Sequence, residues 1–268
     1  MNLPRVGDIE RAAAASPLRV GPSFSALADA DELRYRDEIE HVRDPRLDVA
    51  RFIEQKELVP KLEYSLDHAG LEPAGTIVDL GAGTCWLSAT LARRPEVERT
   101  IAVEFARRRL EELAPIAIAY LGAPAEKIDR VLADFYNHGL GERIADWVFT
   151  DAAFHHAADP VRMARVGYDL LKPGGRLVLF REPTVTPLRG RRDHGVEDEH
   201  GSFEREYRPN AYVEFLREAG FEAAKFPASG GFDSVKARAL LRPPMSWLNG
   251  VLFSEYTYVG RRPIYRPA

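Results

Sequence analysis

Apolar and polar positions repeat in two different ways along the chain, and the change falls near Gly75. Over residues 29–70, apolar residues recur among charged ones at near-helical spacing, with breaks at Asp44-Pro45 and before Pro60. This spacing predicts two or three amphipathic helices. Residues 1–25 show no period, and we expect them to form a loose arm or a late-folding flap.

After Gly75, short apolar runs alternate with helical stretches, which favours a mostly parallel β-sheet with helices on both faces. The runs that predict strands are Thr76–Leu80, Thr100–Glu104, Arg130–Ala133, Trp147–Thr150, Arg176–Phe180, Phe221–Phe226 and Val251–Val259, and the last two are expected to pair. The stretches that predict helices are Cys85–Arg94, Arg107–Tyr120, Pro160–Leu171 and Pro209–Gly220. Lys172-Pro173-Gly174-Gly175 predicts a turn, because proline ends a helix and glycine accepts positive φ. The sequence therefore predicts an α/β fold preceded by a helical region.

Composition and charge narrow the class of protein. A chain of 268 residues is long enough for one large α/β domain or for a domain with an added cap. The formal net charge of −4 does not favour nucleic acid or an anionic membrane as a partner, and acidic neighbours neutralise the basic run Arg189-Gly190-Arg191-Arg192. The single cysteine, Cys85, excludes a disulfide framework and a zinc site built on several cysteines. With no signal peptide or membrane-spanning stretch recognisable, we expect a cytoplasmic protein.

The stretch from Val78 to Thr84 carries the most specific signal in the chain. It predicts a buried strand that passes through two glycines into a helix, where the backbone can approach a ligand and offer it free N–H groups. Asp79, two residues before the first glycine, would repel a pyrophosphate and attract a cationic ligand. The third glycine of a dinucleotide fingerprint would stand where the chain has Trp86, and no Walker lysine follows. A nicotinamide enzyme is therefore disfavoured, but it stays open.

Two further acids end the next two predicted strands. Glu104 is placed to accept the hydroxyls of a ribose, and Asp134 to accept an exocyclic adenine amine with Phe135 against the ring. Ligands of an open α/β sheet bind at the carboxyl ends of its strands, where all three acids fall. Taken singly, Glu104 also fits a surface acid, and Asp134 fits a helix cap.

These motifs together carry a family resemblance. The segments concerned are Asp79-Leu80-Gly81-Ala82-Gly83-Thr84, Glu104, Asp134, Asp151-Ala152-Ala153-Phe154-His155-His156 and Leu170-Leu171-Lys172-Pro173-Gly174-Gly175. In order and spacing they resemble the class I S-adenosylmethionine-dependent methyltransferases, over about residues 71–259. The resemblance implies a Rossmann-like, seven-stranded, mostly parallel sheet whose last strand is inserted antiparallel. It implies an arm and helical cap at 1–70 and a methyltransferase core at 71–268, with a substrate-side insertion at about 181–209.

The resemblance also implies a cofactor, S-adenosyl-L-methionine, and a set of residues that serve it. The residues expected to bind the cofactor are Asp79, Gly81, Ala82, Gly83, Glu104, Phe105, Asp134, Phe135, Thr150 and Asp151. The candidates for catalysis are His155, His156, Glu182 and His200, with Tyr207 also expected near the substrate. Histidine suits a general base for a hydroxyl acceptor, and of two adjacent histidines we expect at most one to act.

The acceptor is less defined than the cofactor. We expect a small molecule, with O-methylation of a sugar or natural-product hydroxyl as the main hypothesis. N-methylation of a small amine and a non-catalytic, methyltransferase-like binding subunit are the alternatives, and a homodimer is left open. No metal site is predicted, although Asp151, His155, Glu182 and His200 carry suitable donor atoms.

Overall fold

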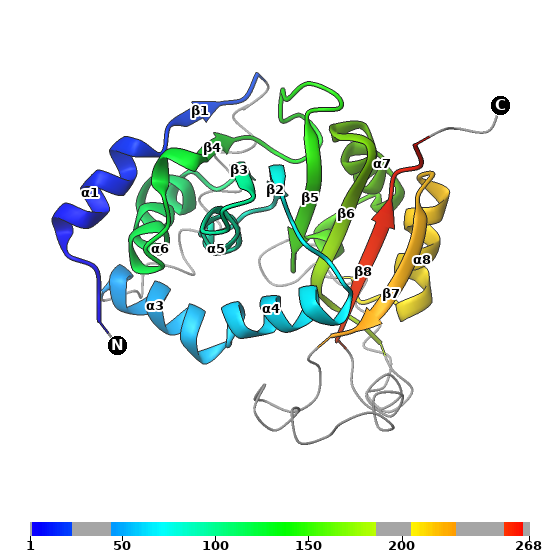
Figure 1. Cartoon of the computed structure of the whole chain (residues 1–268), viewed down its shortest axis with the longest axis horizontal. Helices are drawn as coiled ribbons and strands as arrows, with labels where there is room; N and C mark the ends of the chain where they lie inside the picture. Colours follow the sequence, from blue (N-terminus) through cyan, green and yellow to red (C-terminus); the bar gives the residue numbers. More distant parts are fainter. Residues whose placement is uncertain (1, 23–43, 186–204, 229–254, 265–268) are drawn as a thin grey trace. The chain divides into compact units, whose positions relative to one another are not determined.

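The computed structural model describes residues 2–22, 44–185, 205–228 and 255–264 (Figure 1). The chain folds into two compact units. The first unit contains Met1–Lys56 and Pro73–Trp147, and the second contains Glu57–Glu72 and Val148–Ala268. The predicted site residue His200 and the basic run Arg189-Gly190-Arg191-Arg192 lie outside the described residues.

The first unit contains four parallel strands in the order β1-β4-β3-β2. Its elements are α1 (Val6–Ala15), β1 (Leu18–Val20), α3 (Pro45–Gln55), β2 (Gly75–Leu80), α5 (Trp86–Ala92), β3 (Val97–Glu104), the π-helical η1 (Arg109–Leu113), α6 (Ala114–Tyr120), η2 (Ala125–Lys127) and β4 (Ile128–Leu132). In the register, Leu80 pairs with Val103 and Glu104 pairs with Leu132. The carboxyl ends of β2, β3 and β4 therefore meet at one edge, as predicted for the glycine turn and the acids that follow it.

The N-terminal residues differ from the predicted loose arm, since they form α1 and β1. The buried guanidinium of Arg130 on β4 donates to the backbone carbonyls of Ala13, Ser16 and Leu110. The Ser16 hydroxyl donates in turn to the carbonyl of Ile128, at 2.6 Å. These contacts hold the end of α1 against β4, and Figure 1 shows β1 running along the outer side of β4. β1 brings the strands among the described residues to eight, where seven were predicted.

The second unit contains strands in the order β5-β6-β8-β7. Its elements are α4 (Leu58–His68), β5 (Ala145–Asp151, whose first three residues belong to the first unit), the 3₁₀-helical η3 (Phe154–His156), α7 (Pro160–Leu170), β6 (Leu171–Pro183), α8 (Pro209–Glu218), β7 (Glu222–Pro227) and β8 (Glu255–Arg261). β8 is antiparallel to both β6 and β7 and lies between them. The predicted pairing of the last two strands and the antiparallel insertion of the last one are both confirmed.

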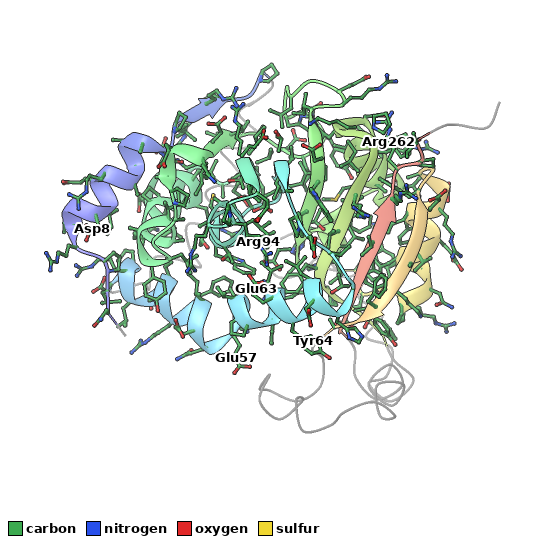
Figure 2. All side chains as sticks on the ribbon, viewed as in Figure 1. Asp8, Glu57, Glu63, Tyr64, Arg94 and Arg262 are labelled. Carbon is green, nitrogen blue, oxygen red and sulfur yellow. The ribbon has the colours of Figure 1, made fainter. Side chains whose placement is uncertain are left out.

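The predicted turn at Lys172-Pro173-Gly174-Gly175 is corrected by the structure, because β6 begins already at Leu171. Gly174 has the expected positive φ of 83°, and its N–H donates to the carbonyl of Arg262 at 2.9 Å. The guanidinium of Arg262, labelled in Figure 2, donates to the carbonyls of Tyr168 and Leu171 at 2.5 and 2.6 Å. A buried arginine thus closes the end of α7, where free carbonyls favour a cation.

Local signals account for where two of the described helices, α3 and α7, begin. Asp44 accepts from the N–H of Arg46 at the start of α3, and Asp159 accepts from the N–H of Arg162 at the start of α7. A proline follows each cap directly, at a position where its missing N–H costs nothing. Among the described residues, we find no helix that is both long enough and apolar enough to cross a bilayer.

Candidate cofactor and acid–base sites

The glycine turn of the first unit is fastened to the end of β3. The N–H groups of Gly81 and Ala82 both donate to the carbonyl of Val103, at 2.9 Å. Gly81 and Gly83 have φ values of 75° and 54°, a region in which glycine carries no steric cost. A Cβ placed on Gly83 would find its nearest neighbour, Arg109 Nη1, at 4.0 Å. The backbone at Gly83 is therefore open on this side, as close approach of a ligand requires.

The residue directly before α5 has an unusual backbone conformation. Cys85 precedes α5 with a φ of 60°, which is costly for a residue with a Cβ. Burial, followed by the nearby charge of Asp79, raises the pKa of the Cys85 thiol well above its usual range. Trp86 is buried, as expected for a core residue. We therefore assign both side chains to the support of the turn.

Asp79 and Glu104 lie on either side of this turn. Asp79 is fully buried, and its Oδ2 accepts from the hydroxyl of Ser88 on α5 at 2.7 Å. Glu104 accepts from the N–H of Gly83 at 2.7 Å through Oε2 and from the N–H of Ala106 at 3.0 Å through Oε1. Glu104 thus connects the glycine turn with the start of the segment after β3. Ser88 was not found from the sequence, because nothing in a nine-residue separation indicates the contact.

Asp134 organises the loop after β4. Its Oδ1 accepts from the N–H groups of Tyr136 and Asn137 at 2.7 and 3.0 Å, and its Oδ2 accepts from Asn137 Nδ2 at 3.0 Å. No helix begins here, so Asp134 closes a turn of the loop rather than acting as the helix cap that the sequence left open, and a carboxylate has further acceptor positions for a ligand amine. Phe135 is half-buried, and its ring meets that of Tyr136 edge-on at 4.7 Å. Phe105 is also half-buried, directly after Glu104.

A cation that the sequence analysis did not single out stands beside the turn. Arg109 begins η1, a single stretch of π-helix that continues into α6. Such stretches interrupt α-helices at a cost and are frequent at functional sites, although sequence patterns do not reveal them.

Taken together, the acids and the glycine turn of the first unit fit one kind of ligand. Such a ligand presents amine and hydroxyl donors to acidic oxygens along an open glycine backbone.

The second unit carries its acids differently. Asp151, at the end of β5, accepts from Arg181 in a two-point ion pair: Nε to Oδ1 at 2.6 Å and Nη2 to Oδ2 at 2.7 Å. Such paired bonds between a guanidinium and a carboxylate are among the strongest polar contacts in proteins. Thr150, the residue before, is buried.

Glu182 is fully buried and accepts at both oxygens. Oε1 accepts from the N–H groups of Ala153 and Phe154 at 3.1 and 3.0 Å, and from Thr150 Oγ1 at 3.4 Å. Oε2 accepts from the backbone N–H of His155 at 3.1 Å and lies 2.9 Å from His155 Nδ1. In the tautomer in which His155 Nδ1 donates to Glu182, Nε2 is the basic nitrogen of the ring.

Backbone strain accompanies this arrangement. Ala152 and Arg181 have positive φ values of 47° and 54°, and the pairing of β6 with β8 shifts register between Leu179 and Glu182. An irregularity of this kind re-aims the side chains that follow it. Residues with positive φ other than glycine are uncommon and cluster at functional sites, so the strained pair marks this part of the second unit.

The remaining predicted residues of the second unit occupy different surroundings. His156 is half-buried, and its ring centre lies 4.0 Å from that of His155. Tyr207 pairs by its backbone with Thr184 and packs its ring edge-on against Tyr212. Burial and then the charge of Glu182 raise the pKa values of Tyr212 and Tyr258. These two phenols are therefore neutral hydroxyls at pH 7.

No group of three potential metal ligands comes together within the described ranges. His200, one of the donors considered from the sequence, lies outside those ranges. Of the other three, Glu182 engages His155 and Asp151 engages Arg181. Asp151 and Arg181 thus form an ion pair, and Glu182 and His155 form a hydrogen-bonded dyad.

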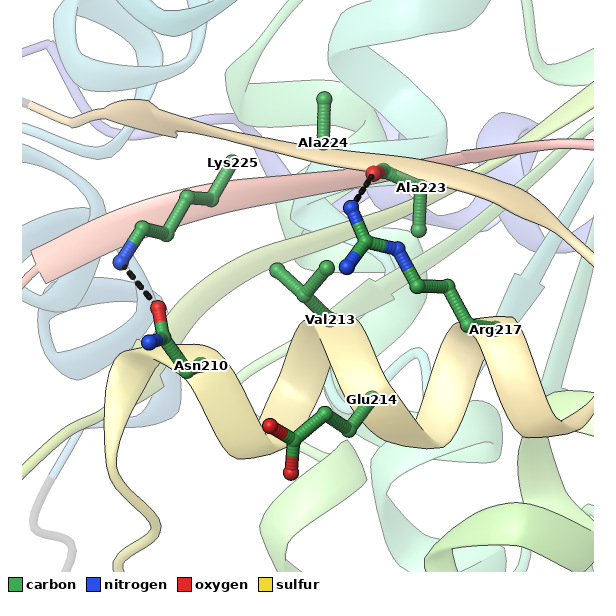
Figure 3. Close-up of a pocket in the computed structure, with 7 residues that line it drawn as sticks. All are labelled: Asn210, Val213, Glu214, Arg217, Ala223, Ala224 and Lys225. Carbon is green, nitrogen blue, oxygen red and sulfur yellow. Dashed lines mark hydrogen bonds between the residues drawn. The ribbon is translucent and has the colours of Figure 1, made fainter.

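A surface pocket lies between α8 and β7 of the second unit, and none of the predicted site residues lines it (Figure 3). It is lined by Asn210, Val213, Glu214, Arg217, Ala223, Ala224 and Lys225. Lys225 Nζ donates to Asn210 Oδ1 at 2.7 Å, and Arg217 Nη2 donates to the carbonyl of Ala223 at 3.2 Å. β7 ends the strand order, so Arg217 covers a carbonyl of an edge strand, which hinders pairing with another chain.

Comparison with known proteins agrees with this geometry. Residues 78–179 match the family model described as a methyltransferase domain. A chain from the complex between the Haloferax volcanii Trm112 methyltransferase activator and a methyltransferase is 19% identical, with a TM-score of 0.62 over 87% of this chain and 99% of that one. A methyltransferase structure from Bacillus halodurans C-125 is 18% identical, with a TM-score of 0.53 over 77% of this chain and 99% of that one. The search of curated proteins found no match.

A third structure with a similar fold is that of a methyltransferase with its methyl donor bound. Phosphoethanolamine N-methyltransferase 2 from Haemonchus contortus, in complex with S-adenosyl-L-methionine, is 11% identical, with a TM-score of 0.54 over 85% of this chain and 60% of that one. This chain therefore carries a methyltransferase domain at residues 78–179, within the α/β fold that these structures share. The domain supports S-adenosylmethionine-dependent methyl transfer as the activity.

Proposed function

We propose that the chain methylates an oxygen of a small molecule, with a sugar or natural-product hydroxyl as the acceptor. The observation that carries this proposal is the dyad of His155 and Glu182. A hydroxyl must lose a proton as it is methylated, so it gains from a general base whose pKa lies near neutral. An uncharged amine acceptor needs no such base. The alternative of N-methylation therefore predicts that His155 is dispensable.

In the first unit, we propose that three acids hold the cofactor. Asp79 would serve the methionine ammonium, directly or through water, while Glu104 would accept from the ribose hydroxyls and Asp134 from the adenine amine. Gly83 would allow the cofactor to lie against the backbone, and Phe105 and Phe135 would flank the adenosine. Glu104 supports this most directly, because its partners are backbone N–H groups beside the open face of Gly83.

In the second unit, we propose that His155 accepts the hydroxyl proton at Nε2 and that Glu182 acts through it. Glu182 fixes the tautomer and the ring orientation, and its negative charge stabilises the imidazolium that forms. It is therefore a positioning residue rather than a group that touches the acceptor. Thr150 and Asp151 stay as proposed cofactor contacts, with Asp151 held in place by Arg181.

When bound, the cofactor would supply an electrophilic methyl group, with a neutral thioether as the leaving group. The protein contributes alignment and the removal of one proton. A cytoplasmic location and a role in natural-product biosynthesis are proposed with the acceptor class. One structural neighbour comes from a complex with an activator protein. A chain that binds the cofactor but shows no turnover would therefore direct the search to a protein partner.

The test is turnover of the full chain with labelled methyl donor and a panel of hydroxyl and amine acceptors. We expect label in hydroxyl acceptors, with His155→Gln lowering kcat by about 10²–10⁴-fold and abolishing the acidic limb of the pH–rate profile. His156→Gln is the matched control, since it changes the neighbouring ring and leaves the Glu182 contact in place. Equal rates for both variants would remove the dyad from the mechanism. Label that appears only in amines, at a rate independent of His155, would establish the N-methyltransferase alternative.

A further inference from the structure

We propose that residues 18–22, called here the strap, set the conformation of the loop at residues 134–139, called here the adenine loop. Through that loop, the strap would determine the preference of the cofactor site for adenine over other bases. The inference rests on the proposed function, because it takes Asp134 as the partner of the adenine amine. All the residues that carry it belong to the first unit.

The strap is fixed along β4 up to the start of the adenine loop. Val20 pairs with Leu132, and the N–H of Gly21 donates to the carbonyl of Leu132 at 2.9 Å. At its other end, the N–H of Arg130 donates to the carbonyl of Pro17 at 2.8 Å. With the guanidinium of Arg130 holding the end of α1, the strap has little freedom relative to β4.

The strap touches the adenine loop closely on both sides of Asp134. A Cβ on Gly21 would lie 2.8 Å from the Cβ of Ala133, the residue before Asp134. A Cβ on Gly139 would lie 2.7 Å from Cγ of Pro22 and closer still to its Cδ. Gly139 also has a φ of 66°. Both contacts therefore depend on glycine, and a larger residue at either place must shift the loop or the strap.

The strap also joins a buried cluster that includes residues of the glycine turn. Leu18 packs against this cluster, whose members include Ala82, Cys85 and Leu132. The same short segment thus packs on the cluster that holds the turn and touches residues that flank Asp134. Interiors are close-packed, so a displacement at one contact is transmitted to its neighbours.

The orientation of Asp134 follows from the conformation of the adenine loop. Its carboxylate is held by the N–H groups of Tyr136 and Asn137, which belong to the loop itself. A loop displaced at Gly139 would carry these donors with it and turn the carboxylate. Such a change alters which base edge is read, whereas partial unfolding would weaken every ligand alike.

The test compares two glycine variants of the full chain. Gly139→Ala introduces the overlap with Pro22, while Gly122→Ala is the matched control, because Gly122 has a similar φ of 60° and no atom within 4 Å of its Cβ position. For each, the dissociation constants of S-adenosylhomocysteine and of S-inosylhomocysteine, which lacks the exocyclic amine, are measured by calorimetry. Amide hydrogen exchange of residues 134–140 is measured without ligand.

We expect the wild type and Gly122→Ala to prefer the adenine ligand, and Gly139→Ala to lose about tenfold of that preference, as for one misplaced hydrogen bond to a charged group. Exchange in the adenine loop should rise only in Gly139→Ala. Adding Pro22→Gly to Gly139→Ala removes the ring and should restore both readouts in part.

An adenine preference and loop exchange in Gly139→Ala that match the control would overturn the proposal. If Gly139→Ala does not fold, Pro22→Gly alone should lower the preference by about threefold, a fraction of one hydrogen bond, and its wild-type behaviour would be equally decisive. If the wild type binds neither ligand, the proposed cofactor site is wrong and the adenine assignment falls with it. That outcome differs from one in which the wild type binds both ligands and its adenine preference is the same in the strap and loop variants. In that case only the role of the strap is wrong.

Discussion

The carboxylates of the two units accept hydrogen bonds from different kinds of donor. The difference suggests which of them are suited to bind a ligand and which stabilise the fold. In the first unit, Glu104 and Asp134 accept from backbone N–H groups and an amide, which are neutral donors. In the second unit, Asp151 accepts from a guanidinium, whereas the fully buried Glu182 accepts from His155 Nδ1 and from three backbone N–H groups. A ligand can share or replace neutral donors at low cost where the site is open. Removing Asp151 would leave the charge of Arg181 uncompensated, and removing Glu182 would leave several buried donors without an acceptor.

The comparison teaches that acids at corresponding strand ends need not do the same work. All of them fall where an open sheet binds ligands, so position alone suggested one shared role. Their partners divide them into acids held by neutral backbone and amide donors and acids that hold other side chains. We therefore expect substitutions at Glu104 and Asp134 to act mainly on ligand affinity, and substitutions at Asp151 and Glu182 to act on stability or turnover as well.

The largest effect is expected for Glu182→Ala. It leaves three backbone N–H groups and His155 without their acceptor in a fully buried place, so the free energy of unfolding should fall by about 3–5 kcal/mol. Urea unfolding followed by circular dichroism measures this. Glu222→Ala is the control, because that side chain is 64% exposed and pairs with Arg261 only at 3.6 Å. A loss no greater than the control's would show that Glu182 is not a structural anchor.

Asp151→Asn should come next. It removes the charge that matches Arg181 while keeping the size of the side chain, and a charge-assisted pair of this kind contributes about 1.5–3 kcal/mol. Thermal unfolding should show a lower midpoint, and Asp151→Asn combined with Arg181→Gln should recover part of it. An additive double variant would contradict the coupling that the geometry implies.

Asp79→Asn and Glu104→Gln should weaken S-adenosylhomocysteine binding by about 1–3 kcal/mol each, as expected when a charged hydrogen bond is lost. Glu104 is itself buried, so Glu104→Gln should also lower the free energy of unfolding. The loss should be smaller than for Glu182→Ala, because Glu104 accepts from two backbone N–H groups, whereas Glu182 accepts from three and from His155. Calorimetric titration gives the affinities, and the same unfolding assay gives the stabilities. A Glu104→Gln protein that is destabilised but binds normally would reverse the comparison between the units.

The smallest effect concerns His138 in the adenine loop. Burial lowers the pKa of His138, opposed by the charge of Asp134, and its Nδ1 accepts from the N–H of Leu140 at 2.9 Å. The unfolded chain therefore takes up the proton first. Stability from this group is present above the unfolded pKa of about 6.5 and is lost as the pH falls through it toward the lower folded value. Urea midpoints between pH 8 and pH 5.5 should show a decline that is shallower in His138→Asn, and equal slopes would refute it.

Much of the fold followed from periodicity and turn chemistry. The apolar runs gave the strands from β2 onward, and Asp44 and Asp159 marked where α3 and α7 begin. β1 was not predicted, because three residues are too few to show an alternating pattern. Its position also depends on contacts of Arg130, more than a hundred residues away. The start of β6 was missed because Gly174 takes its positive φ within the strand itself.

The residues of the candidate site could be predicted from the sequence, but their hydrogen-bond partners could not. Asp79, Glu104 and Asp134 stood out because each lies at or just after the carboxyl end of a strand, at the same edge of the sheet. Nothing in the sequence tells that Ser88 donates to Asp79 or that Arg181 pairs with Asp151. The contact of Glu182 with His155 depends on the irregular stretch near Arg181, which sequence patterns do not reveal.

The central claim is that the acid-bearing strand ends of the first unit form a site for a sulfonium cofactor rather than for a dinucleotide. Parallel calorimetric titrations of the full chain with S-adenosylhomocysteine and with NADH test it most directly. The account predicts saturable binding of S-adenosylhomocysteine, weakened in Glu104→Gln, and no heat with NADH. Saturable binding of NADH without binding of S-adenosylhomocysteine would contradict it.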